Sequence, residues 1–451
     1  MRSVTPGPWP KPRPSLPSIQ RPAESGRDNG TYSAKRAAPF AAFVIAALTI
    51  RFGFDRLFAD TSIALGSANV SVGIVFNVAF VFIGFSLLGY AFLVRRSIQS
   101  DATLAVVLWV PFLASLFGSL IYSDQVVEGG KFAWNVLAFF SLFVIGLHYS
   151  RFYSMPRMAD IVARMGMFPI LISALYLVID GTGERLRGAT THPNILAFFL
   201  FFYIAFCYHG LVWGWFKSSA SRWIATSFAA LATLELLLTG TRSAFIALFA
   251  FVLVSTLRKP LWLVAVLPAP LLALAIPSVY ERVVEVTQPK ADLSYEYVMA
   301  SARGDTDAES AVVADSGKWR MFLWQAAWPV ILERPLLGHG TSSFLPSSQT
   351  FFPLNATGGS GAHNIYVQIL FEQGLVGLIS YLWLIGGTCA LSILRWRRNP
   401  GVAVFIVMLV FCFGVASFSD NMLYYLIVQI YIWFISGFAL GTLTNEKLRE
   451  R

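Results

Sequence analysis

The chain has 451 residues, of which 56% are hydrophobic and only 13% are charged, and its formal net charge is +10. This composition places the chain in the membrane class rather than among water-soluble globular proteins. A positive balance of this size is typical of binding to nucleic acid or to anionic lipid, but here the basic residues lie in short connections between long apolar runs. Membrane topology therefore explains the charge, and no nucleic-acid partner is expected.

The amino-terminal segment 1–36 is rich in Pro, Ser, Arg and Gly and has no apolar periodicity, which predicts a disordered tail. An inert basic tail is favoured over a Pro-rich interaction motif. The first apolar run begins near Ala37, so no secretory signal peptide is visible.

Apolar runs long enough to cross a bilayer recur from Ala37 onward. We predict an all-α, polytopic transmembrane helix bundle of about twelve spans, the first of which is the weakest because Arg51 interrupts it. The spans are predicted near 37–54, 71–94, 103–122, 132–149, 165–179, 193–215, 222–239, 243–257, 260–277, 365–394, 401–418 and 421–442.

The chain is accordingly divided into nine spans in 37–277, one large loop in 278–362, three spans in 363–442 and a short tail in 443–451. Lys and Arg occupy every second connection and both tails, so both termini are predicted to be cytoplasmic. The large loop then lies on the periplasmic side, where we expect it to carry short amphipathic helices. A loop of this length in a compact bundle is usually functional or disordered.

Within that loop, residues 318–332 are predicted to form a helix, because apolar side chains recur there at spacings of three and four. Trp324 and Trp328 suit a membrane interface. Arg320 lies beside the apolar stripe. The spacing fits an interfacial helix with a snorkelling arginine as well as a helix that covers a cavity into which Arg320 reaches.

Two histidines stand in this region. His363 and Asn364 begin a span on the external side, where a histidine serves as a cap or packing group or, near neutral pH, accepts a proton. His339 lies between Gly338 and Gly340, which predict a sharp turn, and a structural role is favoured for it.

Three arginines, Arg185, Arg187 and Arg242, stand at external span ends, where the positive-inside tendency disfavours them. One explanation is pairing with acids on the same face. The other is a diphosphate site completed by Arg320, since a guanidinium binds phosphate oxygens through two parallel hydrogen bonds. The candidate acidic partners are Asp180, Glu184 and Asp420.

Two carboxylates lie within predicted spans, where acids are functional candidates by default. Glu372 follows His363 on the same predicted helix, two to three turns deeper, and is expected to pair with an arginine of the site. Glu235 is expected to lock a contact between helices. Cys207, Cys389 and Cys412 all lie in apolar runs without metal-ligand spacing and are interpreted as packing residues.

The sequence contains no His-Glu-x-x-His motif, no Asp-rich pair, no cluster of His and Cys, and no phosphate-binding Gly loop. We therefore predict a site that uses no metal, no nucleotide triphosphate and no other cofactor.

Four segments stand out as motifs. They are Arg-Leu-Arg-Gly-Ala-Thr-Thr-His-Pro-Asn-Ile-Leu-Ala at 185–197, Leu-Leu-Leu-Thr-Gly-Thr-Arg-Ser-Ala at 236–244, Glu-Arg-Pro-Leu-Leu-Gly-His-Gly-Thr-Ser-Ser-Phe at 333–344 and Ala-His-Asn-Ile-Tyr-Val-Gln-Ile-Leu-Phe-Glu-Gln-Gly-Leu-Val-Gly at 362–377. These segments resemble the superfamily of O-antigen ligases and of O-antigen and exopolysaccharide polymerases, over a stretch from about Arg185 to Leu440. The order of the motifs, the number of spans and the loop before the tenth span all match.

The resemblance implies a bacterial inner-membrane glycosyltransferase that acts on the periplasmic side and uses neither metal nor ATP. Its substrate would be a glycan linked to undecaprenyl diphosphate. Polymerases transfer the glycan to the next repeat unit, and ligases transfer it to a sugar of the lipid A core. The implied partners are this lipid-linked glycan, an acceptor glycan, the bilayer and, as a further candidate, a chain-length regulator.

By matching position, the resemblance implies that His363 deprotonates the acceptor hydroxyl and that Arg242, Arg320 and Arg187 hold the diphosphate. Arg185 joins them as a diphosphate candidate. His339 departs from the family pattern and keeps the identity of the base open. The candidates for supporting roles are Asn194, His339, Asn364 and Glu372.

A base without a carboxylate nucleophile predicts direct displacement with inversion at the anomeric carbon. A polymerase of O-antigen or exopolysaccharide is the favoured function, because nothing in the loop indicates a lipid A core acceptor. The alternatives are an O-antigen ligase, a transporter or flippase of lipid-linked glycan, and an inactive assembly subunit. A transporter is disfavoured because matched, Gly- or Pro-broken repeats are absent from the sequence.

Overall fold

The computed structural model describes part of the chain, and everything below concerns those residues. The tail 1–36, the span predicted at 260–277 and residues 445–451 lie outside them. The described residues are 42–65, 68–94, 99–181, 185–259, 280, 284, 294–303, 316–352, 354 and 359–444.

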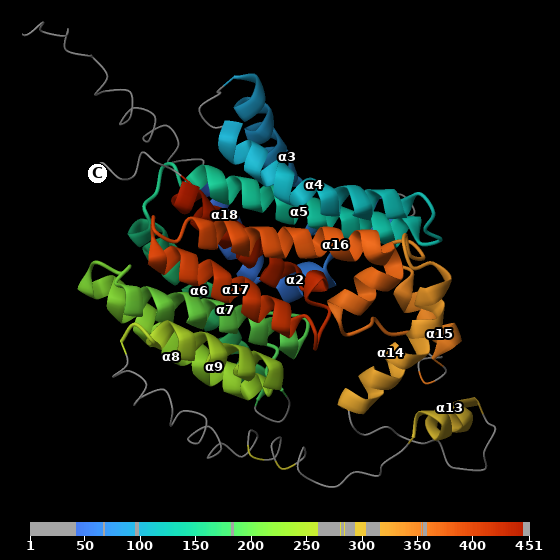
Figure 1. Cartoon of the computed structure of the whole chain (residues 1–451). Coiled ribbons are helices and arrows are strands. Elements are labelled where there is room, and N and C mark those ends of the chain that lie inside the picture. The colour runs from blue at the N-terminus through green and yellow to red at the C-terminus, as the bar shows by residue number, and fades with distance from the viewer. Residues whose placement is uncertain are drawn as a thin grey trace, which may run out of the picture.

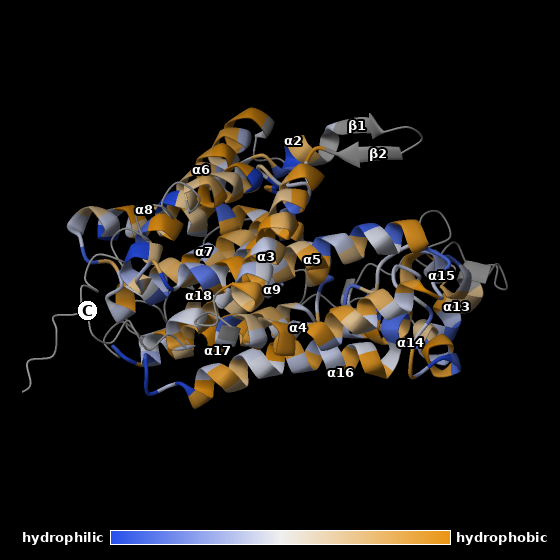
Figure 2. Ribbon diagram, turned by 90° about the horizontal axis from the view of Figure 1, so that it is seen from above, coloured by the Kyte–Doolittle hydropathy of each residue, from blue (hydrophilic) through white to orange (hydrophobic). Residues whose placement is uncertain are grey.

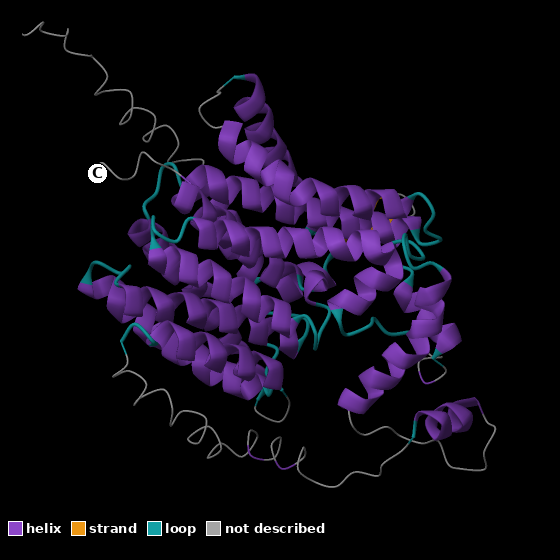
Figure 3. Ribbon diagram, in the orientation of Figure 1, coloured by secondary structure: helices purple, strands orange, loops and turns teal. Residues whose placement is uncertain are grey.

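Helices make up almost all of the described chain and run largely side by side (Figures 1 and 3). Eight are long and apolar enough to cross a membrane, and three shorter apolar helices accompany them, so the chain is a multi-pass membrane protein. The total of about twelve spans stays a prediction. The eight are α3 (Ile74–Leu93), α4 (Gln99–Leu120), α5 (Val126–Tyr149), α6 (Met155–Asp180), α7 (Pro193–Trp213), α8 (Ser219–Thr239), α16 (Ile365–Leu394) and α18 (Leu426–Thr444), and the shorter ones are Ala42–Gly53, α9 (Arg242–Thr256) and α17 (Pro400–Ala416).

Arg51 does not interrupt the first of these helices. Its Nη1 lies 2.6 Å from Oδ1 of Asp55, and both side chains are buried. Asp55 opens the short helix α2 (Asp55–Asp60), so the charge in the apolar run is compensated one turn later.

The expectation of an all-α chain misses one antiparallel hairpin, formed by β1 (Ser62–Leu65) and β2 (Ala68–Ser71). Its register pairs Ser62 with Ser71 and Leu65 with Ala68. Strands of four residues are too short to appear in a search for apolar runs of span length.

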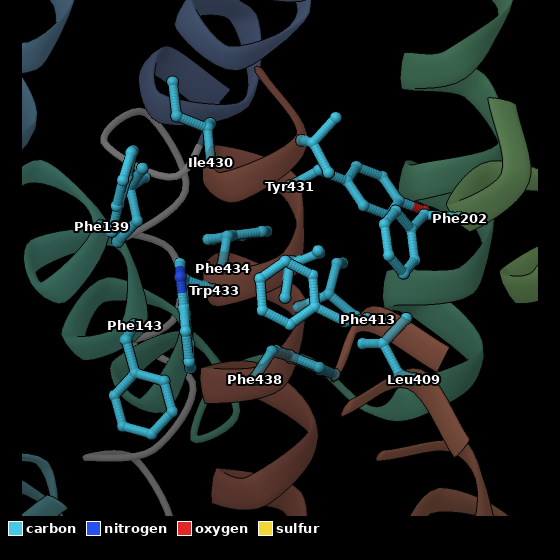
Figure 4. Close-up of a cluster of buried hydrophobic side chains, with 14 of the residues drawn as sticks. Phe139, Phe143, Phe202, Leu409, Phe413, Ile430, Tyr431, Trp433, Phe434 and Phe438 are labelled. Atoms are coloured by element: carbon cyan, nitrogen blue, oxygen red, sulfur yellow. The ribbon is translucent and has the colours of Figure 1, made fainter. Parts of the chain in front are cut away.

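The centre of the bundle is formed by α5, α7, α17 and α18, which carry most of the buried aromatic side chains. Figure 4 shows Phe139 and Phe143 of α5 beside Trp433 and Phe434 of α18. In Figure 2, hydrophobic residues colour most of the helices, and hydrophilic residues are frequent near the two ends of the bundle. This pattern fits helices that expose apolar sides to lipid and polar ends to water.

Small residues bring the backbones of α5 and α18 together. A Cβ on Gly146 would lie 2.2 Å from the Phe434 carbonyl oxygen, and one on Gly437 would lie 2.1 Å from the Phe143 carbonyl oxygen. Close backbone approach through glycine is a common way to associate helices in lipid, where the hydrophobic effect contributes little.

Helix α16 is broken at Gly374, where φ is +64°. The freed backbone groups bond to the 335–340 loop: Leu375 N donates to Pro335 O at 2.9 Å, and Gly340 N donates to Glu372 O at 2.8 Å. Gly338 and Gly340 both have positive φ, which confirms the predicted turn. The kink therefore anchors the loop without leaving backbone groups unpaired.

Three further helices, α13 (Tyr295–Arg303), α14 (Ser316–Glu333) and α15 (Phe344–Phe351), gather at one end of the bundle (Figure 1). They share a second buried cluster with α16, which includes Leu323, Ala327, Phe344 and Phe371. The helix predicted at 318–332 is α14, and its predicted apolar face is the one that packs into this cluster.

Candidate active site

A cavity of about 890 Å³ lies at the end of the bundle where α5, α7 and α16 begin, next to α14 and α15. Five of the residues for which the sequence suggested a role in the site line it, and Asp420, suggested only as an acidic partner, does so as well. The five are Arg185, Asn194, Arg320, His363 and Glu372. These residues come from stretches nearly 190 positions apart in sequence, so the fold assembles the cavity from distant segments. The other lining residues include Gln125, Glu128, Lys131, Phe132, Asn135, His192, Ser342, Gln368, Asp420, Asn421, Tyr424 and Tyr425.

His363 is positioned from three sides. Its Nδ1 lies 3.5 Å from Oδ1 of Asp420, and its ring packs edge-on against Trp319 at 5.8 Å. The carbonyl of the preceding residue, Ala362, accepts a 2.7 Å bond from Trp324 Nε1. The His363 side chain nevertheless stays 38% exposed, so Nε2 is available to a molecule in the cavity.

Asp420 is buried and connects His363 with Asn194 and, through Asn194, with Arg185; these four residues are called the polar relay below. Asn194 Nδ2 donates to Asp420 Oδ2 at 2.6 Å, and Asn194 Oδ1 accepts from Arg185 Nη2 at 2.9 Å. Burial raises the pKa of Asp420, but hydrogen bonds from His363, Tyr425 and Asn194 lower it more, so the pKa lies below its usual value. An ionised Asp420 fixes the His363 ring and favours Nδ1 as the protonated nitrogen.

The two arginines of the cavity differ in their surroundings. Arg185 is held in place by bonds to the Thr239 carbonyl at 2.7 Å and the Thr241 hydroxyl at 3.0 Å, in addition to Asn194. Arg320 is half-buried, and among the described residues no carboxylate lies within salt-bridge distance of it. A half-buried guanidinium without an acidic partner favours an anionic ligand.

Arg187 and Arg242 are exposed and are not among the residues that line the cavity. Both stand next to the relay in sequence, since Arg242 follows Thr241 and Arg187 lies two residues after Arg185. Of the predicted acidic partners, Asp420 accepts a hydrogen bond from Asn194 and does not form an ion pair with Arg187 or Arg242. Glu184 and the side chain of Asp180 lie outside the description.

Glu372 is 1% exposed and accepts the hydrogen bonds of a second polar network. Its Oε1 accepts from Gln368 Nε2 and, at 3.4 Å, from Phe344 N. Gln368 Oε1 in turn accepts from Ala362 N at 2.8 Å. The expected arginine partner of Glu372 is not found among the described residues, and Glu372 instead braces the segment that carries His363.

The remaining predicted residues have structural contacts. Asn364 is the N-cap of α16, with Oδ1 accepting from Tyr366 N and Val367 N at 3.0 and 3.2 Å. His339 Nε2 lies 2.7 Å from the Val330 carbonyl, and its ring packs on Phe371 outside the cavity lining. These contacts give both residues a role in positioning α16 and its loop.

Backbone strain concentrates at the cavity. The only non-glycine residues with positive φ in the described part of the chain are Ser342, at +65°, and His363, at +49°, and both line the cavity. Such conformations cost about 1–3 kcal/mol each and persist where the surroundings enforce them, as they do at many functional sites.

The first turns of α5 also line the cavity. Phe132 stacks on Tyr424 at 4.6 Å with an interplanar angle of 21°, and Lys131 pairs with Glu128 at 2.7 Å. Gln125 lies at the start of these turns. Amides, charges and an aromatic face are groups that bind sugar hydroxyls and rings.

The sequence reasoning missed several lining residues, above all Asp420, which it weighed only as a partner for an arginine. His192 was also missed, although it lies in one of the quoted motifs; its Nδ1 caps α7 by accepting from Asn194 N at 3.1 Å. Burial, opposed by Asp420, lowers the pKa of His192, which keeps this acceptor neutral. Among the described residues, no group of three or more His, Cys, Asp or Glu is placed to hold a metal ion.

Comparison with known proteins adds one match. No curated protein matches the chain. Residues 226–382 match the family model described as O-antigen ligase, a stretch that contains Arg242, Arg320, His363 and Glu372. Together with the membrane-spanning helices, this match supports a membrane glycosyl-transfer function with a lipid-linked glycan and an acceptor as substrates. Residues 226–382, a part of the chain that includes the start of α16, are thus similar to the O-antigen ligase family.

Proposed function

We propose that this protein is a polymerase of O-antigen or exopolysaccharide that transfers a glycan from undecaprenyl diphosphate to the next lipid-linked repeat unit. The proposed location is the bacterial inner membrane, with both termini cytoplasmic and the 890 Å³ cavity on the periplasmic face. The observation that carries the proposal is the meeting, in this single cavity, of a carboxylate-oriented histidine and an arginine that has no acidic partner among the described residues.

In this proposal Arg320 and Arg185 bind the diphosphate of the donor. When the glycosidic bond breaks, negative charge develops on the departing diphosphate, and fixed guanidinium groups stabilise it without reorganisation. Arg187 and Arg242 extend the positive charge beyond the cavity wall. The support for this division is that Arg185 and Arg320 line the cavity, while the other two flank the relay in sequence.

His363 then acts as the general base. Its Nε2 takes the proton of the acceptor hydroxyl as that oxygen attacks the anomeric carbon, and the imidazolium is stabilised by Asp420 at 3.5 Å. The bond to the diphosphate oxygen breaks in the same step, which inverts the anomeric configuration. His363 is preferred over His339 because only His363 lines the cavity. The α5 wall, with Phe132 and Tyr424, is the proposed position of the acceptor sugar.

The proposal is tested by the glycan that cells make when the chromosomal gene carries His363→Ala or Arg320→Gln. Wild type and a deletion strain are the references, and Arg397→Gln is the matched control, since Arg397 is exposed, does not line this cavity and follows the end of α16 that lies away from it. Membrane levels of each variant are measured in parallel.

Each outcome has a distinct meaning. A polymerase predicts that lipid-linked single repeat units accumulate and long chains disappear in both variants but not in the control. A ligase predicts that full-length chains accumulate on the lipid carrier without reaching lipid A. Normal glycan in both variants at normal protein levels would contradict the proposed site and favour a transporter.

A further inference from the structure

A second cavity, of about 640 Å³, is lined by the segment that joins α7 to α8, by the end of α9 and by the start of α17. Its lining includes Trp213, Trp215, Lys217, Arg258 and Asn399. The proposed reaction uses none of these residues, because all of them lie outside the candidate active site, and of the five only Arg258 lies within the stretch 226–382 that the family model matches.

The second cavity lies at the opposite end of the bundle from the first. Helix α7 begins at Pro193, next to His192 of the first cavity, and ends at Trp213 of the second. A helix of this length spans about 30 Å, the thickness of a bilayer core. Figure 1 shows the helices running between these two ends, with α14 and α15 at the end of the first cavity.

Arg258 is held in place by aromatic contacts. Its guanidinium carbon lies 4.2 Å from the centre of the Trp213 ring, a favourable cation–π distance. Trp213 is itself stacked on His209, at 5.5 Å and 14°, and His209 is buried with its ring nitrogens 3.0 Å from Ser255 Oγ and 2.9 Å from the Gly401 carbonyl. The Trp213 ring that contacts Arg258 is therefore itself supported by the buried, hydrogen-bonded ring of His209.

The charge of this cavity is not balanced by acids. Among the described residues, no carboxylate lies within salt-bridge distance of Lys217 or Arg258, and no Asp or Glu lines the cavity. Two unbalanced cations that border one cavity favour a phosphate group as the ligand.

The surrounding surface has the features of a membrane interface. Trp223 and Trp396 are 72% and 44% exposed, and Leu257, next to Arg258, is 65% exposed. Exposed tryptophans beside basic residues are typical of the headgroup level of a bilayer. The cavity thus lies at the depth where phospholipid phosphates are found, and basic pockets between helices at this level bind anionic headgroups.

We propose that this cavity is a binding site for a phosphate ester anion, with Lys217 and Arg258 as its cationic ligands. The phosphate belongs to an anionic phospholipid headgroup or to a soluble phosphate ester. The two sources share the same recognition chemistry and differ in whether binding requires acyl chains.

The test uses the full chain, purified in detergent and stripped of lipid. Binding of phosphatidylglycerol and of phosphatidylethanolamine is measured by native mass spectrometry, and binding of glycerol 1-phosphate by calorimetry. The combined Lys217→Gln and Arg258→Gln variant should weaken binding of phosphatidylglycerol, of glycerol 1-phosphate or of both on the order of tenfold. Loss of phosphatidylglycerol binding alone identifies the lipid as the source, and loss of glycerol 1-phosphate binding identifies a soluble ester.

The matched control combines Arg222→Gln and Arg397→Gln, which removes the same charge from exposed residues that do not line the cavity. The control should bind as the wild type does. A charge-conserving variant, Lys217→Arg with Arg258→Lys, should retain binding because both positive charges are kept, and circular dichroism of each variant shows whether a loss of binding comes from misfolding instead. The proposal would be overturned if the cavity variant and the control bound both phosphatidylglycerol and glycerol 1-phosphate equally well.

Discussion

Each end of the bundle carries a cavity lined by basic side chains, and the two cavities differ in the groups that hold those side chains in place. At the larger cavity, Arg185 is fixed by hydrogen bonds and His363 by a buried carboxylate. At the smaller cavity, Arg258 is fixed by the ring of Trp213, and no acid lines the wall. A site with a buried carboxylate and strained backbone suits a reaction that moves a proton, whereas a cavity with cations alone suits binding.

The largest expected effect that separates the two ends is the loss of Arg320. Arg320→Gln should lower the rate of glycan transfer by the purified protein about 1,000-fold, because the charge that develops on the diphosphate loses its fixed partner. Arg320→Lys should recover part of the rate, since an ammonium keeps the charge but not the two parallel hydrogen bonds. Arg397→Gln is the control, and a rate for Arg320→Gln equal to that of this control would remove Arg320 from the site.

The next effect concerns the carboxylate that is present only at the larger cavity. Asp420→Asn should lower the transfer rate about 100-fold with little change in donor affinity, because the ring of His363 loses its orientation and the imidazolium its counter-charge. The measurement is single-turnover transfer at saturating donor. A variant that lowers donor affinity at an unchanged rate would indicate that Asp420 serves binding instead.

The same carboxylate predicts a dependence of stability on pH. The pKa of Asp420 is lowered in the folded protein, so its contribution is fully present above the unfolded pKa of about 4 and is lost as pH falls through the lowered value. Thermal unfolding of wild type and Asp420→Asn in detergent should therefore differ at about pH 5 and converge as the pH falls below the unfolded pKa. A difference that grows below a pH of about 4 would contradict the direction of the shift.

The kink in α16 is expected to matter for stability more than for chemistry. Gly374→Ala should lower the free energy of unfolding by about 2 kcal/mol, because a Cβ there would lie 2.3 Å from the Leu336 carbonyl at a positive φ. Gly386→Ala on the same helix is the control, since a Cβ there meets nothing within 4 Å. Unfolding followed by circular dichroism compares the two, and equal stability would show that the loop yields to the new methyl group.

The smallest expected effect lies at the other end. Gly401→Ala should lower the free energy of unfolding by about 1 kcal/mol, because its Cβ would lie 2.5 Å from Cε3 of Trp213 and displace that ring. Near-ultraviolet circular dichroism should report the movement of tryptophan. An unchanged tryptophan signal would mean that the Trp213 ring, which contacts Arg258, is less tightly packed than the distances indicate.

Local patterns predicted the elements well and their contacts poorly. The spacing of apolar residues predicted α14 to within two residues at its start and one at its end, because a helix face is a local property. Asp420 was missed as a site residue because its contacts with Asn194 and His363 join segments 226 and 57 positions away. Periodicity carries no information about such pairs.

The smaller cavity shows a different reason for a miss. Lys217 and Arg258 were counted as topology signals, which explains their presence on one side of the membrane. Their meeting beside Trp213 depends on how α7, α9 and α17 pack, which the sequence alone does not reveal. Motif resemblance performed better at the larger cavity, since the quoted segments contain Arg185, Asn194, His363 and Glu372, all of which line it.

The most direct test of the central claim is to find which end of the bundle holds the lipid-linked glycan. A photocrosslinking amino acid is introduced in place of Leu345, which lines the larger cavity, or of Leu257 at the opposite end, and labelled undecaprenyl-diphosphate glycan is added before irradiation. We expect crosslinking from position 345 that is lost when Arg320→Gln is added, and none from position 257. Crosslinking from position 257 alone would contradict the assignment of the reaction to the larger cavity.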